Sequence, residues 1–156
     1  RDLLKWDIQT SPSYLGALDI GPYHFRRWKG ILGMPSHKRN EFLDRGRAVY
    51  QRDKKLADQA AAQAFPLTLL GTEGLQANVP NVLQSLAADS LLKTHPFAAL
   101  WCLQDHGQVV KVGLRARPGF DVTPIAKHFG GGGHPYASAF LLPVSRLPEL
   151  LSNRLV

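Results

Sequence analysis

The stretch VGLRARPGFDVTPIAKHFGGGGHPYASAFLLP, residues 112–143, contains the pattern that decides the fold. It begins with alternating apolar residues, which are typical of a strand. Thr123 is expected to cap a short helix that has Pro124 at its first position and ends at Gly130. After the glycines, residues 137–142 return to a strand pattern. We therefore expect four elements in this order: a strand, a short helix, a glycine loop and a second strand.

The sequence outside this stretch extends the same alternation of strands and helices. Apolar residues at three- and four-residue steps predict a long helix over residues 37–64, with Gly46 as its weak point. Further along the chain we expect a hairpin with its turn at Gly71–Gly74, a helix from about Asn81, two strands around Asp105–His106–Gly107, and a closing helix. The fold class is therefore α/β, a mixed β-sheet flanked by helices and preceded by a long basic linker helix.

These patterns divide the chain into three segments. Residues 1–36 show no sustained period, and we expect an irregular connector with short helical turns. Residues 37–64 form the linker helix, and residues 65–156 form the α/β domain. Because the chain begins at Arg1, we expect a processed product or an excised piece of a longer protein.

The net charge of +7 belongs to one segment of the chain. Residues 26–55 carry ten Lys and Arg against three acidic residues, whereas the remaining residues carry nine of each. Such a segment could attract nucleic acid or another polyanion. The alternative is an ordinary solvated helix face, and the sequence does not decide between the two.

Cysteine content and hydropathy argue against a disulfide-stabilised protein and against a membrane-spanning protein. The single cysteine, Cys102, excludes a disulfide framework; it is expected to be a buried structural thiol in a reducing, cytoplasmic setting. No apolar run approaches the roughly 20 residues that span a bilayer, so we expect no membrane partner. Oligomeric state is not predicted.

The four consecutive glycines, Gly130 to Gly133, allow two interpretations. Their backbone N–H groups could form an anion-binding concavity, with His134 as a further donor and Arg115 nearby for bidentate phosphate contact. They could equally form a tight turn that lets the helix and the next strand pack closely. No Lys-Ser/Thr follows the glycines, so this is not the loop of nucleoside-triphosphatases.

The same residues carry a family resemblance. In order along the chain these are Arg115, Asp121–Val122, Ile125–Ala126, Phe129, Gly130 to Gly133, His134 and Ala137. The stretch resembles the DHH-associated C-terminal domain of DHH-family phosphoesterases, whose members degrade short RNAs, cyclic dinucleotides or single-stranded DNA. The resemblance implies a mixed α/β domain joined by a linker helix to a catalytic domain. Residues 1–36 would then be the connector from a missing N-terminal catalytic domain.

The resemblance also implies a binding site. In that family the glycine stretch, its histidine and the strand arginine hold the terminal nucleotide or its phosphate, which carries over to Arg115, Gly131, Gly132, Gly133 and His134. This sequence departs from the family pattern at two places that bear on the identity of the substrate. Gly113 and Ala116 stand where serines commonly flank the arginine, and Ala137–Ser138–Ala139 replaces the usual Ala-Ala-Gly.

The catalytic half of that family holds two metal ions, usually Mn²⁺, through residues that include an Asp-His-His signature. These 156 residues contain no such triplet, and Asp105–His106 lies in a predicted turn. We therefore expect no catalytic residues, no metal site and no bound cofactor on this chain, with Mn²⁺ in the missing domain.

The expected function is that of the substrate-binding domain of a DHH-type phosphoesterase, as the resemblance implies. It would hold a short single-stranded nucleic acid or a nucleotide phosphodiester for hydrolysis by the missing DHH domain, which would be its protein partner. The alternatives are a stand-alone nucleic-acid-binding module, for which the basic segment supplies charge, and a structural dimerisation domain. RNA, DNA and cyclic dinucleotides are not distinguished.

Overall fold

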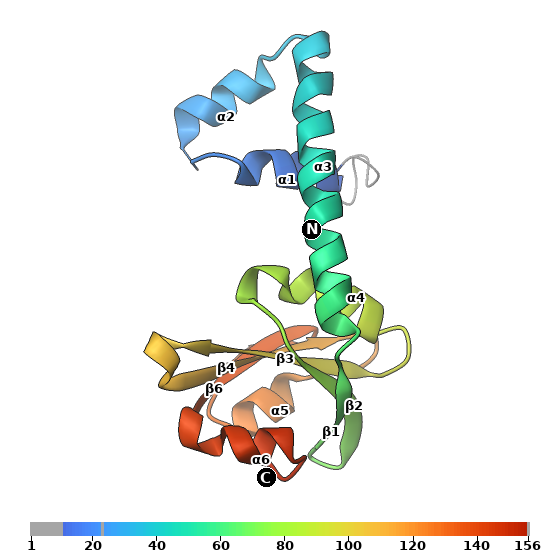
Figure 1. The fold of residues 1–156 in the computed structure, drawn as a ribbon, viewed down its shortest axis with the longest axis vertical. Coiled ribbons are helices and arrows are strands. Elements are labelled where there is room, and N and C mark those ends of the chain that lie inside the picture. Colours follow the sequence, from blue (N-terminus) through green and yellow to red (C-terminus); the bar gives the residue numbers. More distant parts are fainter. Residues whose placement is uncertain (1–10, 23, 156) are drawn as a thin grey trace. The chain divides into compact units, whose positions relative to one another are not determined.

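The computed structural model describes residues 11–22 and 24–155 (Figure 1). The chain divides into two compact units, Arg1–Lys55 and Leu56–Val156. The first contains α1 (Ser11–Asp19), α2 (Phe25–Leu32) and most of α3 (Ser36–Ala61). The second contains β1 (Phe65–Leu69), β2 (Thr72–Asn78), α4 (Gln84–Leu91), β3 (Phe97–Gln104), β4 (Val109–Ala116), α5 (Thr123–His128), β5 (Gly132–His134), β6 (Ala137–Pro143) and α6 (Leu147–Leu151).

The second unit is built on a six-stranded mixed sheet with the order β1-β2-β3-β4-β6-β5. Strands β2 and β3 are parallel, and every other neighbouring pair is antiparallel. The parallel pair needs a crossover, which α4 supplies. The predicted fold class, a mixed sheet flanked by helices, is confirmed.

Alternating side chains divide the sheet between two apolar clusters. On one face, Phe97 and Ala99 of β3 join Leu114 and Phe140 in a core that α5 and α6 cover (Figure 1). On the other face, β2 and β3 pack against α4 and the last residues of α3, in a cluster that contains Ala57, Ala61, Ala77, Val79, Ala87, Ala88, Leu91, Ala98 and Leu100. The second cluster is built mainly from alanine, so the helices lie close to the sheet there.

Several predicted elements are confirmed, and their details differ. The hairpin turns at Leu70–Gly71, whereas Gly74 lies inside β2. A side chain at Gly74 would come within 2.6 Å of the buried Phe97 ring, which explains a glycine in a strand. The helix expected from about Asn81 begins there as one 3₁₀ turn and continues as α4.

The short helix α5 is capped by a different residue from the one predicted. Thr123 is its first residue and Val122 is its N-cap; the side chain of Asp121, one residue earlier, accepts a hydrogen bond through Oδ1 from the Thr123 N–H at 2.7 Å. The side-chain and backbone hydrogen bonds from Thr123 lower the pKa of Asp121. The predicted end is confirmed: Gly130 has φ +75° and donates its N–H to Lys127 O at 3.0 Å.

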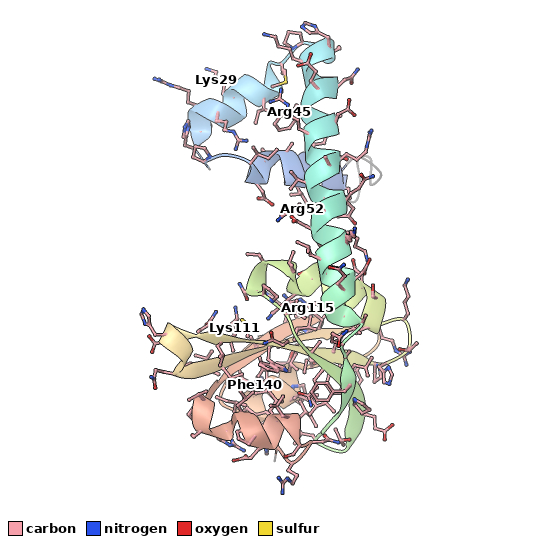
Figure 2. All side chains as sticks on the ribbon, in the orientation of Figure 1. Lys29, Arg45, Arg52, Lys111, Arg115 and Phe140 are labelled. Carbon is pink, nitrogen blue, oxygen red and sulfur yellow. The ribbon has the colours of Figure 1, made fainter. Side chains whose placement is uncertain are left out.

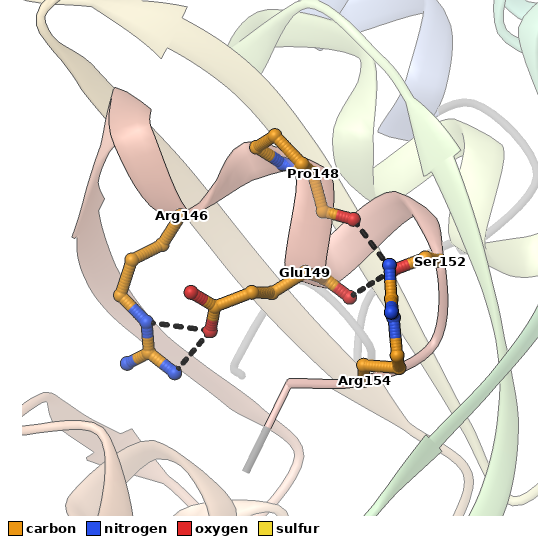
Figure 3. Close-up of polar contacts among 5 residues, drawn as sticks. All are labelled: Arg146, Pro148, Glu149, Ser152 and Arg154. Carbon is orange, nitrogen blue, oxygen red and sulfur yellow. Dashed lines mark hydrogen bonds and ion pairs between the residues drawn. The ribbon is translucent and has the colours of Figure 1, made fainter.

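The last helix, α6, is short and is held by side-chain contacts at its end (Figure 3). Arg146 contacts Glu149 through Nε and an Nη atom, at 2.9 and 2.8 Å. Ser152 Oγ donates to Pro148 O at 2.7 Å and accepts from Arg154 Nε at 2.9 Å. Of these bonds, one reaches a helix carbonyl: Pro148 O accepts from Ser152 Oγ and also from the Ser152 N–H at 3.0 Å.

In the first unit, the connector expected over residues 1–36 contains two short helices, α1 and α2. The Arg27 guanidinium donates to Ala17 O, Leu18 O and Gly21 O, at 3.0, 2.7 and 3.0 Å, and so closes the end of α1. These helices are too short to be stable alone, so contacts with neighbouring segments stabilise them. Residues 1–10 lie outside the described part.

The long helix predicted over residues 37–64 is confirmed as α3, which begins at Ser36 and ends at Ala61. It passes through Gly46 without interruption. Gly46 is buried because α1 crosses α3 at this residue: a Cβ on Gly46 would lie 2.7 Å from the Ala17 Cβ and would also meet Ser13 O. Within residues 11–22 and 24–155, each helix is too short or too polar to span a bilayer.

This crossing predicts opposite effects for two glycine-to-alanine substitutions in helices. Gly46→Ala should destabilise the docking of α1, because a clash of about 1–3 kcal/mol exceeds the gain of about 1 kcal/mol in helix propensity. Gly30→Ala in α2 is the matched control, since nothing lies within 4 Å of its added methyl group; it should stabilise its helix by about 0.5–1 kcal/mol. Amide hydrogen exchange in α1 measures the difference, and equal protection in both variants would contradict it.

Candidate functional site

A pocket of about 200 Å³ lies on the face of β4 and β6 that bears Lys111 and Arg115. It is lined by Asn81, Gln84, Lys111, Gly113, Arg115, Gly132, Ala137, Ser138 and Ala139. The floor therefore comes from three neighbouring strands, β4, β6 and β5, and one wall comes from the start of the α4 crossover.

The two-residue period of β4 places its polar side chains in this pocket. Val110, Val112, Leu114 and Ala116 are buried in the core beneath α5 and α6. The intervening residues, Lys111, Gly113 and Arg115, must therefore lie on the opposite face. Apolar burial on one face is thus the reason that two cations share the other.

Both cations, which Figure 2 labels, donate hydrogen bonds to neighbouring groups. Lys111 Nζ donates to Asn81 Oδ1 at 2.7 Å. Arg115 donates an Nη hydrogen bond to Leu114 O at 3.0 Å, and its half-buried position lowers its pKa through desolvation. The guanidinium remains protonated at neutral pH. None of the described residues that line the pocket is acidic, so the site favours an anion.

Gln84 forms the polar part of the wall. Its side chain is buried, and Nε2 donates to Leu100 O at 2.9 Å and to Val79 O at 3.3 Å. Nε2 also lies 4.0 Å from the sulfur of Cys102, which is half-buried and not fully buried as predicted. The carboxamide oxygen Oε1 lies over Gly113, where a Cβ would collide with it.

The first two glycines of the run donate their N–H groups inside the protein. Gly130 bonds to Lys127 O, and Gly131 bonds to Ala126 O at 2.8 Å. The Gly131 N–H is therefore already paired within the protein. Gly131 serves the alternative interpretation, a tight turn: a Cβ there would meet Ala139 O and come within 2.7 Å of Phe140.

The last two glycines lie in β5, a strand that replaces the loop we expected. Gly133 has φ +146°, and a Cβ there would come within 2.6 Å of Ala137 O, so it too is required for packing. Gly132 has no such neighbour within 4 Å and no positive φ. It lines the pocket, where a bare backbone leaves room for a ligand.

His134 does not line the pocket, although it lies on the same side of the sheet. Residues that pair directly across antiparallel strands project to the same face. His134 pairs with Ala137, and Ala137 lines the pocket, so the imidazole is placed on the pocket face at the end of β5. It is exposed, and its carbonyl accepts a hydrogen bond from Ser138 Oγ at 2.9 Å.

Of the five predicted site residues, the pocket thus brings together Arg115 and Gly132 and leaves out Gly131, Gly133 and His134. Sequence reasoning missed Lys111, which the alternation in β4 could have revealed. It also missed Asn81 and Gln84, for which no sequence signal exists because their position depends on how the crossover packs on the sheet. Within residues 11–22 and 24–155, no three His, Cys, Asp or Glu side chains are grouped as metal ligands.

The family expected from the resemblance is confirmed by comparison. The model of the DHHA1 domain family matches residues 70–153, which is more than half of the chain, and the chain belongs to this family. No curated protein sequence matches this chain.

Solved structures share the fold at low sequence identity. One is a pGpG-specific phosphodiesterase, PggH from Vibrio cholerae, with a TM-score of 0.56 and 7% identity over 90% of this chain. Another is the DHH domain of a member of the s1p family of ribosomal proteins, with a TM-score of 0.52 and 16% identity over 78% of this chain. The present chain spans 53% and 34% of the length of these proteins, respectively.

Adjacent glycines of the run should respond differently to the same substitution. Gly131→Ala should lower the free energy of unfolding by about 1–3 kcal/mol, because its methyl group meets the β6 backbone. Gly132→Ala should leave it nearly unchanged, since its methyl group enters open space. Urea unfolding of the two variants checks this, and equal losses of stability would contradict the separation of roles.

Proposed function

We propose that residues 56–156 hold the phosphate-bearing end of a short single-stranded nucleic acid or nucleotide. The supporting observation is the pocket in which Arg115 and Lys111 lie on one sheet face, around the bare backbone of Gly113 and Gly132, with no acidic residue among the described lining. Partial burial of the guanidinium strengthens its attraction for phosphate relative to an exposed arginine.

The size of the pocket supports a terminal group as the ligand. About 200 Å³ is below the range of about 300–1,000 Å³ that is typical of pockets enclosing a whole drug-sized ligand. A phosphate with its adjoining sugar fits this volume better than a complete dinucleotide does. The rest of the ligand would extend away from the pocket, towards a second protein surface.

In this proposal, the phosphodiester bond is hydrolysed by a DHH catalytic domain that the 156 residues do not include. Metal ions of that domain, with Mn²⁺ expected, would activate the attacking water. Asp105 and His106, the adjacent pair nearest to the signature, lie at the tip of the β3–β4 connection with side chains that are 71% and 98% exposed. The fold is shared with a phosphodiesterase specific for pGpG, which supports a small nucleotide as the substrate. A cytoplasmic location, which the single cysteine favours, belongs to the same proposal.

The alternative, a stand-alone nucleic-acid-binding module, is favoured by exposed cations of the first unit. Lys29, Arg45 and Arg52 are exposed there (Figure 2). Part of this charge is compensated locally, since Arg45 lies 3.9 Å from Glu41 and Arg52 lies 3.5 Å from Asp53. The surface therefore suits weak tracking of a polyanion better than recognition of one terminal phosphate.

Binding of 5′-phosphorylated di- to pentanucleotides distinguishes the two functions. The chain should prefer these ligands to longer strands, and Arg115→Ala should weaken binding about tenfold or more, because a charge-assisted hydrogen bond is lost. Fluorescence anisotropy over a salt series measures both effects. The variant His134→Ala should also weaken binding, because the imidazole lies on the pocket face of the sheet.

The matched control is Arg154→Ala, which removes an arginine that follows α6, away from the pocket, and should leave affinity unchanged. Affinity that rises with strand length, falls steeply with salt and ignores Arg115 would support the stand-alone module instead.

The chain alone should not hydrolyse these ligands in the presence of Mn²⁺, because the proposal assigns the metal centre to another domain. Chromatography of a 5′-phosphorylated dinucleotide after incubation with purified protein checks this. Cleavage that co-purifies with the protein and is lost in Arg115→Ala would contradict the division of labour.

A further inference from the structure

Gln84 combines near-complete burial with a place in the pocket wall. Its side chain is 1% exposed, and its Nε2 is anchored by two backbone carbonyls, Val79 O and Leu100 O. Both bonds come from the same nitrogen, so the carboxamide is held in one orientation. The oxygen Oε1 must then point away from these carbonyls, over Gly113 at the centre of the pocket.

The hydrogen bonds of the Gln84 carboxamide to other described residues all use Nε2, and its oxygen Oε1 faces the pocket. A carbonyl oxygen in that position can accept a hydrogen bond from a ligand or from an ordered water. The two charged side chains of the pocket, Lys111 and Arg115, donate instead to Asn81 Oδ1 and Leu114 O. The pocket thus presents one fixed acceptor beside two cations.

Gly113 is the residue that makes this arrangement possible. Any side chain at position 113 would occupy the space of the Gln84 carboxamide, as the collision of a Cβ with Oε1 shows. Gly113 and Gln84 therefore act as a pair. The bare backbone of the strand admits the carboxamide, and the anchored nitrogen turns its oxygen into the pocket.

We propose that Gln84 determines specificity by accepting, through Oε1, a hydrogen bond from a hydroxyl or N–H donor of the nucleotide whose phosphate Arg115 holds. This proposal rests on the proposed function. Gly113 is two residues from Arg115, a separation of about 7 Å along a strand, which is within the length of one nucleotide. The donor is a ribose hydroxyl or a base N–H, and the experiment separates these sources.

The test compares ligands that differ by one donor, using the full chain. The probes are 5′-phosphorylated dinucleotides in ribo and 2′-deoxy forms, and pairs with guanine against hypoxanthine, which lacks the exocyclic amino group. Removing the donor that Oε1 accepts should weaken binding about 3- to 10-fold. If the 2′-deoxy ligand binds more weakly, the donor is the ribose hydroxyl. If the hypoxanthine ligand binds more weakly, the donor is the amino group of the base.

The protein variants assign this discrimination to Gln84. Gln84→Met should abolish it and leave the dependence on Arg115 intact. Gln76→Met is the matched control, because Gln76 is equally buried and donates Nε2 to Leu150 O on the opposite face of the sheet; this variant should discriminate like the original chain. If Gln84→Met does not fold, Gly113→Ala displaces Oε1 without removing the anchoring amide and should also abolish discrimination.

Two failures are distinguishable. If binding depends on Arg115 but no donor deletion matters, or if discrimination survives in Gln84→Met or Gly113→Ala, the inference on Gln84 is overturned and the proposed function stands. If phosphorylated ligands do not bind, or bind without regard to Arg115, the proposed function fails and the inference fails with it.

Discussion

Strand β4 is hydrogen-bonded along both edges, to β3 over eight residue pairs and to β6 over seven, and the site depends on this constraint. A strand in that position has only two faces for its side chains. Because Val110, Val112 and Leu114 fill the core, Lys111 and Arg115 are placed together on the other face without any contact between them being required. The two cations therefore share one face of the sheet because the apolar side chains of β4 are buried on the other face.

Close approach of backbone segments is the second organising principle, and it accounts for glycines with unrelated purposes. Gly46 lets α1 cross α3, and Gly131 lets the end of α5 lie against β6. Gly113 makes room for the carboxamide of Gln84, whereas Gly132 has no protein neighbour to accommodate. The four-glycine run is thus one sequence feature with several structural causes, of which only the role of Gly132 concerns the pocket.

The pocket offers two cations and one oriented acceptor on one face of the sheet. In the function proposed above, these groups position a phosphate and a neighbouring donor, and hydrolysis is assigned to a DHH catalytic domain. The chain belongs to the DHHA1 domain family and spans 53% and 34% of the length of its two structural neighbours.

The sequence by itself determined the elements whose causes are local or periodic. Alternation predicted β3, β4 and β6, three- and four-residue steps predicted α3, and the ordered motif from Arg115 to His134 identified the family. Tertiary structure alone decided which of these residues meet. Gln84 enters the pocket through the parallel crossover, Gly46 is the point where α1 crosses α3, and the Gly131 N–H donates to a helix carbonyl. The physical reason is the same in each case: these roles depend on backbone groups that are distant along the chain, and periodicity carries no information about them.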